Sequence, residues 1–152
     1  MTEPRVAAGI VAFLVWRHQF LLILRDDKPD ILSPNTWCPV TGGREDDETL
    51  WDAACRECKE EIGIIPHHFT LLGVSAKGNG FCFGRLSDDE KDSIVLGEGQ
   101  RYSFYSFDSL SSVELSGAMK GYLERYRLVF KKMAEGEQPP FGSELGLATW
   151  NG

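Results

Sequence analysis

The stretch 42–64 reads GGREDDETLWDAACRECKEEIGI, and its spacing constrains the fold more than any other part of the chain. It fits the pattern G-x5-E-x7-R-E-U-x-E-E-x-G-U, in which U is an apolar residue. The fixed positions are filled by Gly42, Glu48, Arg56, Glu57, Glu60, Glu61 and Gly63, and the apolar ones by Cys58 and Ile64. A glycine turn, a run of helix-forming residues and a closing glycine predict a loop followed by one helix.

The two ends of this helix have local signals. Thr49 is a suitable N-cap, and Asp52 three residues later completes a weaker form of the capping box. Gly63 predicts the C-terminal end, and Pro66 prevents continuation beyond it. We therefore expect a helix over residues 50–62.

On a helical wheel at about 100° per residue, this helix has an apolar face and an acidic edge. The apolar face comprises Leu50, Trp51, Ala54, Cys55, Cys58 and Ile62. The acidic edge comprises Glu57, Glu60 and Glu61, with Ala53 between them. Carboxylates on one edge repel one another, and near the C-terminal end they oppose the helix dipole. The edge therefore favours a bound cation, although an acidic cluster can also be a solvated face.

The charge of the whole chain points to the same place. Between Glu45 and Glu61 there are eight acidic and two basic residues, so nearly all of the net charge of −7 lies there. Hard oxygen ligands of this kind suit Mg²⁺ or Mn²⁺.

Together these residues resemble the signature of the Nudix hydrolases, a family that cleaves nucleoside diphosphates linked to another group. The resemblance covers roughly residues 6–132. It implies an α/β fold, a Nudix-type α/β/α sandwich with a mixed sheet between helices. It also implies Mg²⁺ as cofactor, with Mn²⁺ able to substitute.

The resemblance assigns roles to individual residues. The metal ligands would be Glu57, Glu60, Glu61 and the backbone carbonyl of Thr41, which stands before the first glycine. Many nucleotide-cleaning members have Pro-Gly where this chain has Val40-Thr41, which makes the loop conformation and substrate subclass less certain. Glu48 and Gly42 would support the site without binding the metal, and Arg56 would brace the carboxylates.

Glu98 lies between Gly97 and Gly99 ahead of a predicted strand, and it resembles the distal metal ligand or general base of several Nudix enzymes. Glu57 is the alternative base. The residues expected to act in catalysis are Glu57, Glu60, Glu98 and Arg56.

Candidate substrate-binding residues lie outside the signature. Arg25 ends a predicted strand before the irregular segment 26–35 and could bind a phosphate or be an ordinary surface arginine. Aromatic residues on predicted strands could stack on a base, although such residues are more often core. These aromatic residues are Trp37, Phe81, Phe83, Tyr102 and Phe104.

The remaining elements follow from apolar patterning. We expect strands over residues 6–16, 20–24, 37–40, 69–76, 81–86 and 101–107, with a hairpin turn at 17–19. Residues 88–92 should form a charged loop, and residues 115–133 a second helix. We expect one domain over 1–135 and an irregular tail over 136–152.

Composition restricts the partners. A pI near 5.0 argues against a nucleic-acid polymer. The apolar run 6–16 is too short to span a bilayer, so we expect no membrane association. Cys55 and Cys58 form a CxxC that could suggest zinc or redox chemistry, but no second pair follows, so reduced thiols and a cytoplasmic location are expected.

We therefore expect a magnesium-dependent hydrolase that acts on a small nucleotide, as a monomer or homodimer. The preferred substrate is a nucleoside triphosphate, normal or modified, cleaved to monophosphate and pyrophosphate. One alternative is hydrolysis of nucleotide sugars or dinucleoside polyphosphates. Another is a nucleotide sensor without catalysis, which loss of a signature glutamate would mark; none is lost.

Overall fold

The strand that organises the molecule is β1 (Gly9–Trp16), which is apolar along nearly its whole length. In this computed structural model, which describes residues 9–136, alternate side chains of β1 enter two separate cores. One core receives Val11, Phe13 and Val15, and the other receives Ile10, Ala12 and Leu14. A strand that is buried on both faces has a continuous apolar sequence, and this explains the apolar run from Gly9 to Trp16. The part of the expected strand before Gly9 lies outside the described residues.

Within the described residues, seven strands form one mixed sheet whose main path is β3-β2-β1-β6-β5. β1 is parallel to β6, and the other pairings are antiparallel. The remaining strands are β2 (Gln19–Leu24), β3 (Trp37–Cys38), β4 (Val40–Gly43), β5 (His68–Val74), β6 (Asn79–Arg85) and β7 (Arg101–Ser106).

The sheet is split between β1 and β2, and the split positions the glycine pair. β1 and β2 pair only beside their hairpin turn. Farther along, β3 pairs with the end of β2, while β4 pairs with the start of β1. The segment 37–43 therefore lies between the two strands, with Gly42 opposite Ile10 and Gly43 opposite Gly9.

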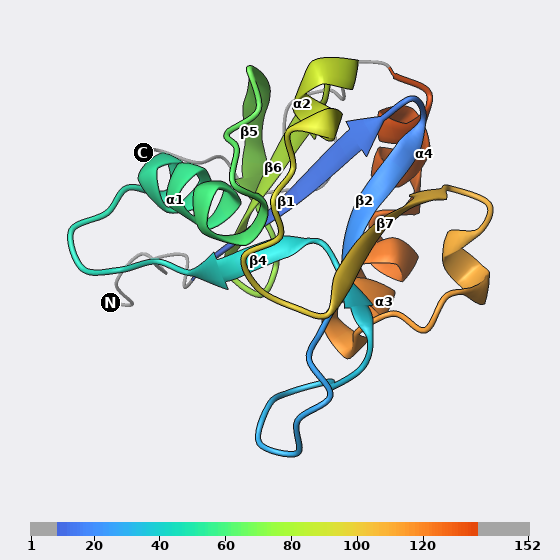
Figure 1. The fold of residues 1–152 in the computed structure, drawn as a ribbon, viewed down its shortest axis with the longest axis horizontal. Helices are drawn as coiled ribbons and strands as arrows, with labels where there is room; N and C mark the ends of the chain where they lie inside the picture. The colour runs from blue at the N-terminus through green and yellow to red at the C-terminus, as the bar shows by residue number, and fades with distance from the viewer. Residues whose placement is uncertain (1–8, 137–152) are drawn as a thin grey trace.

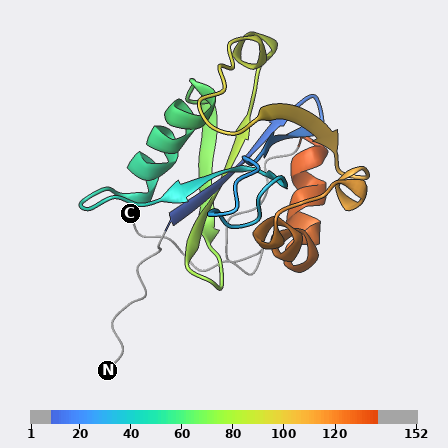
Figure 2. The same cartoon turned by 60° about the horizontal axis from the view of Figure 1, so that its bottom comes forward.

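Helices cover both faces of the sheet, which confirms the α/β/α sandwich. α1 (Leu50–Ile62) covers one face, and α3 (Gly117–Arg125) and α4 (Arg127–Ala134) cover the other (Figures 1 and 2). The short α2 (Asp88–Asp92) follows β6, and a 3₁₀ turn (Leu110–Ser112) follows β7. No helix in the span 9–136 is both long and apolar enough to cross a membrane.

The signals at the ends of α1 are confirmed. The Thr49 side chain accepts a hydrogen bond from the Asp52 backbone N–H at 3.0 Å, and the Thr49 N–H reaches Asp52 Oδ2 at 3.5 Å. Gly63 has φ 76°, the left-handed conformation in which glycine is favoured at a helix C-terminus.

Two expectations about secondary structure were wrong. Residues 88–92 form a helix rather than a loop, because Ser87 and Glu90 make a reciprocal capping box. The helix expected over 115–133 is two helices that break at Tyr126, which has φ −116° and ψ 35°. The Tyr126 ring packs on Phe81 at a centroid distance of 5.1 Å, a tertiary contact that the local sequence does not encode.

The buried face of α1 is also rotated from the expected one. Trp51 is 36% exposed and packs at the surface on Phe69, and Cys55 is only half-buried. Ala53, Glu57 and Glu61 are buried instead. The helix therefore turns part of its acidic edge toward the sheet. The tail expected at 136–152 lies, from residue 137 onward, outside the described residues.

Candidate active site

Two of the α1 carboxylates are buried, which is unusual for charged side chains. Glu57 is 8% exposed and Glu61 is 6% exposed, whereas the Glu60 side chain is 49% exposed. Because the helix packs against β4, its inner edge meets the glycine pair. The structure thus separates the three clustered glutamates into a buried pair, Glu57 and Glu61, and a half-exposed one, Glu60.

Gly42 makes room for the buried pair. A Cβ atom at position 42 would overlap the Glu57 carboxylate, so this carboxylate lies directly against the β4 backbone. The neighbouring Thr41 backbone N–H forms a hydrogen bond to the Glu61 carboxylate. Glycine is therefore required at position 42 for a spatial reason, and β4 contacts both buried glutamates.

Arg56 holds the carboxylates on this side of α1. Its Nε and one terminal nitrogen donate to both oxygens of Glu48 at 2.8 and 3.0 Å. The other terminal nitrogen donates to Glu57 Oε1 at 2.8 Å and to Glu60 Oε2 at 3.2 Å. Arg56 also donates to the Gly43 carbonyl at 2.9 Å. The Arg56 guanidinium lowers the pKa of Glu48, and Glu48 raises the pKa of Arg56.

Glu98 reaches the site because two glycines anchor its loop. The Gly97 N–H donates to the Glu61 carbonyl at 2.8 Å, and a Cβ there would overlap the Glu60 carbonyl. Gly99 has φ 89°, and a Cβ there would crowd Ile23 at the end of β2. The loop therefore joins the end of α1 to the end of β2, with Glu98 between them.

Glu61 has the most perturbed electrostatics of these carboxylates. Burial, then a hydrogen bond and repulsion from Glu57, then repulsion from Glu98 raise the pKa of Glu61 from 4.5 to about 9, while the Thr41 N–H lowers it. Glu61 Oε2 is the one buried side-chain oxygen or nitrogen in residues 9–136 without a hydrogen-bond partner. A buried oxygen of this kind is expected to meet a missing partner such as a cation or a water.

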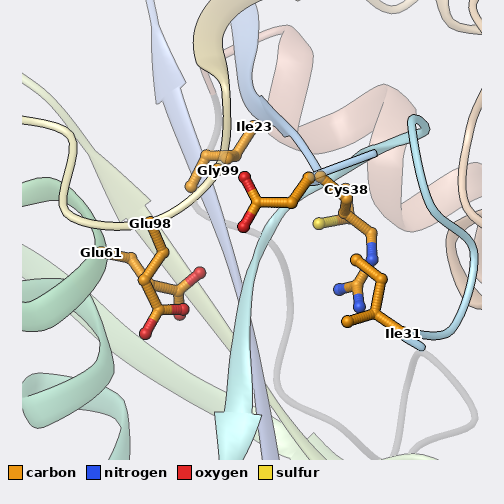
Figure 3. Close-up of a pocket in the computed structure, with 8 residues that line it drawn as sticks. Ile23, Ile31, Cys38, Glu61, Glu98 and Gly99 are labelled. Carbon is orange, nitrogen blue, oxygen red and sulfur yellow. The ribbon is translucent and has the colours of Figure 1, made fainter. Parts of the chain in front are cut away.

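Glu61 and Glu98 line a cavity of about 180 Å³. Figure 3 shows the carboxylates of Glu61 and Glu98 together on one side, with Cys38 and Ile31 across from them. Arg25 and Asp26 complete the polar lining. The cavity thus combines three carboxylates with one guanidinium.

Arg25 also lines a second cavity of about 270 Å³, on the α3 side of the sheet. Cys38 lines both cavities, because both lie at the split between β1 and β2. The Arg25 Nε donates to the Leu32 carbonyl at 2.9 Å, which ties Arg25 to the loop 26–35. Two sites on opposite faces of the sheet therefore share one arginine.

Of the five aromatic residues expected to stack on a base, three are buried in the core and two are half-buried. Phe81 and Phe83 are 0% and 2% exposed and lie in the core beneath α3 and α4. Trp37 is buried in the same core, with its ring against Tyr105 at a centroid distance of 5.1 Å. Tyr102 and Phe104 are half-buried and pack against the opposite core. Hydrophobic burial accounts for the positions of Phe81, Phe83 and Trp37.

Several residues of the two cavities carried no sequence signal for a site. Asp26 and Cys38 line the first cavity, and Met119 and Tyr122 line the second. Only the spacing of Met119 and Tyr122, three positions apart in a helix, could have indicated a shared face. All four cysteines are free thiols, and none forms a disulfide within the described chain.

Metal binding can be tested on the residues themselves. Over residues 9–136, no three His, Cys, Asp or Glu side chains converge closely enough to form a ready-made metal cluster. However, Glu61 Oε2 has no partner, and the Glu57 carboxylate lies against backbone that only glycine allows. A buried, oxygen-only set of this kind fits a hard divalent cation.

Comparison with known proteins agrees with this geometry. Residues 3–140 match the family described as NUDIX domain. No curated protein sequence matches the chain significantly.

Solved structures with the same fold include a Nudix hydrolase from M. smegmatis, RenU, at 17% identity and a TM-score of 0.62, covering 86% of this chain and 89% of that one. A MutT protein from Methanosarcina mazei Go1 has 19% identity and a TM-score of 0.58, and the match covers 90% of this chain and 100% of that one. A C. elegans Ap4A hydrolase has 21% identity and a TM-score of 0.56, and the match covers 79% of this chain and 96% of that one.

Because the family match spans most of the sequence and the fold agrees, the chain belongs to the Nudix family of hydrolases, which act on pyrophosphate bonds.

Proposed function

We propose that this protein is a Mg²⁺-dependent pyrophosphohydrolase that converts a nucleoside triphosphate, normal or modified, to its monophosphate and pyrophosphate. The observation that carries the proposal is the buried Glu57–Glu61 pair, of which Glu61, with its unpartnered oxygen, lines a cavity that Arg25 also lines. A carboxylate pair this deeply buried needs a compensating cation, and a nearby guanidinium suits a phosphate.

Glu57, Glu60 and Glu61 would hold the metal, together with the Thr41 carbonyl. Bound there, Mg²⁺ supplies charge neutralisation for phosphate oxygens and lowers the pKa of an attacking water. Arg56 keeps Glu57 in place through the 2.8 Å hydrogen bond, with Glu48 as its second anchor.

Glu98 takes a proton from the attacking water, because it is the exposed carboxylate of the cavity and lies beside Glu61. Arg25 binds a phosphate oxygen and orients the chain of phosphates. No covalent nucleophile is needed, since phosphoryl chemistry of this type depends on positioning and electrostatics.

The two cavities support a compact substrate. Their volumes of about 180 and 270 Å³ are each smaller than the roughly 300–1,000 Å³ usual for drug-sized ligands. Phosphates and cations suit the first cavity, and a single base suits the second, with Arg25 between them. A substrate with two nucleosides has no comparable second compartment among the pockets of the described chain that touch Arg25.

The decisive experiment is hydrolysis of a nucleotide panel in oxygen-18 water, with and without Mg²⁺. We expect nucleoside triphosphates to give monophosphate and pyrophosphate, with the label on one of these two products, and chelation to abolish the reaction. If triphosphates are untouched while an ADP-sugar, ADP-ribose or Ap4A is cleaved with kcat/KM of about 10⁴ M⁻¹s⁻¹ or more, the triphosphate proposal is wrong.

A further inference from the structure

One of the residues that line the second cavity is Tyr122, whose hydroxyl oxygen already accepts a hydrogen bond. Tyr122 on α3 is 9% exposed and lines this cavity. Its ring packs edge-on against Phe81 and Phe13, at centroid distances of 5.0 and 6.5 Å. The ring is therefore held in one orientation by the core, and this fixes the position of its hydroxyl.

Asn79, at the start of β6, determines what this hydroxyl can still do. The Asn79 Nδ2 donates a hydrogen bond to the Tyr122 oxygen at 3.0 Å. No residue in the described part of the chain accepts the Tyr122 hydroxyl hydrogen. The phenolic oxygen is thus engaged as an acceptor, and its hydrogen remains for a ligand.

The other hydroxyl-bearing residues of the cavity are Ser33, Thr41 and Ser116. Its other walls are mainly apolar, with Val11, Leu32, Pro39 and Met119 among them. Apart from Arg25, no carboxylate, amide or charged side chain lines it. The Tyr122 hydroxyl differs from these three hydroxyls in that its ring is held by the core and its oxygen by Asn79. A donor fixed in this way is an effective discriminator, because a ligand group that cannot accept leaves a buried polar group unpaired.

We infer that the Tyr122 hydroxyl donates a hydrogen bond to an exocyclic oxygen on the base of the substrate, and that Asn79 positions this hydroxyl. The inference rests on the proposed function in taking a nucleotide as the ligand. An oxo group accepts the hydrogen and projects beyond the ring edge toward the wall. An amino group at the same position presents its own hydrogens to the donor, so amino-bearing bases bind less well.

Two substrate pairs isolate this contact: UTP against CTP, and ITP against ATP. Within each pair the base has about the same size and carries an oxo group in the first member and an amino group in the second. We expect wild-type protein to prefer the oxo member in kcat/KM by about tenfold, the scale of one net hydrogen bond. Tyr122→Phe should reduce this ratio to about twofold or less, chiefly by raising KM for the oxo member.

The chain provides a matched control in Tyr126. This tyrosine is 5% exposed, packs on Phe81 at 5.1 Å, and accepts a hydrogen bond from the Ala76 N–H at 3.4 Å, but it does not line the cavity. Tyr126→Phe should keep the wild-type ratio. Asn79→Ala should lower the ratio while leaving the Tyr122 ring in place, because the hydroxyl is then free to rotate.

The inference is overturned if Tyr122→Phe keeps the wild-type ratio, if Tyr126→Phe lowers it equally, or if the wild type prefers the amino members. A ratio that is lost in Tyr122→Phe and kept in Tyr126→Phe supports it.

A binding measurement separates this result from the fate of the proposed function. Titration calorimetry with UMP, CMP, IMP and AMP in the presence of a chelator requires no hydrolysis. If triphosphates are not cleaved but the monophosphates show the oxo preference, lost in Tyr122→Phe, the hydrolase proposal fails and the cavity inference stands. If triphosphates are cleaved with no dependence on Tyr122, the inference fails and the hydrolase proposal stands. If no nucleotide binds or is cleaved, both are overturned.

Discussion

At the scale of single residues, the site depends on carboxylates in places where a protein of ordinary composition would put apolar groups. Glu61 is almost completely buried, with one oxygen unpartnered, and Glu57 lies against a glycine. Without a cation, these charges repel one another and lack solvation. The two buried carboxylates are therefore expected to destabilise the metal-free fold.

Glu61→Gln should make the metal-free protein more stable at pH 8, by about 1 kcal/mol or more. The pKa of Glu61 is raised from 4.5 to about 9, so the folded state holds a proton that the unfolded chain has released. The wild-type protein should therefore lose stability as the pH rises from about 4.5 to 9, and the variant should lose less. Urea unfolding with a chelator at pH 5 and pH 8 measures this. Equal pH dependence in the two proteins would contradict it.

Glu98→Gln tests the proton acceptor. We expect kcat to fall by about a hundredfold, within the range of losing general-base catalysis, while Mg²⁺ affinity changes by only a few-fold. Steady-state kinetics and Mg²⁺ titration measure the two effects. Glu124→Gln on the exposed side of α3 is the control and should behave as wild type. Loss of Mg²⁺ binding without a specific loss of kcat would instead identify Glu98 as a ligand only, and Glu57 as the likelier base.

At the scale of elements, the site forms where α1, β4 and the loop before β7 meet. α1 brings its carboxylates through its helical spacing, and β4 supplies the glycine that admits them. The loop is attached to the end of α1 by the Val95 and Gly97 N–H groups, at 3.0 and 2.8 Å. A change in the loop backbone should therefore act on catalysis through the position of Glu98.

Gly97→Ala tests this attachment. The added methyl group overlaps the Glu60 carbonyl, so the loop must move away from α1. A displacement of about 1 Å is enough to reduce kcat by about a hundredfold. Gly121→Ala is the matched control, because a Cβ there meets nothing within 4 Å. It should leave kcat unchanged and stabilise α3 by up to about 1 kcal/mol. Wild-type kcat in Gly97→Ala would show that the attachment does not position Glu98.

At the scale of the whole molecule, the split in the sheet gives this small protein two cavities that share Arg25 and Cys38 in their linings. β3 and β4 enter between β1 and β2, and the two cavities lie on either side of this segment. Arg25, at the end of β2, faces both cavities. Ligands that engage both compartments should hold the two layers of helices and the sheet together.

Mg²⁺ bound by the α1 carboxylates should raise the melting temperature of the whole protein. A ligand that binds only the folded state at 100 times its Kd stabilises by about 2.7 kcal/mol. Differential scanning calorimetry across a Mg²⁺ series should show this for the wild type and a much smaller effect for Glu61→Gln. Ca²⁺ at equal concentration is a comparison for ion size. No Mg²⁺ dependence in the wild type would contradict the assignment of the carboxylates as metal ligands.

The sequence alone determined the features that depend on nearby residues. The ends of α1 follow from Thr49, Asp52 and Gly63, because capping hydrogen bonds join residues within about one turn of each other. The hairpin turn at Arg17 and His18 is equally local, with both residues at positive φ. The signature spacing identified the family for the same reason, since the carboxylates stand one turn apart on one helix.

Only the tertiary structure decided which side chains face the core and which face a ligand. Trp51 was expected to be buried and is exposed, whereas Glu57 and Glu61 are buried. Phe81 and Phe83 are core residues, and Tyr122 and Cys38 line cavities. The rotation of a helix about its axis is set by the strand against which it packs. For α1 this strand is β4, whose glycine pair leaves room for the buried glutamates. Packing of this kind is a long-range property, so hydrophobic periodicity within one segment does not specify it.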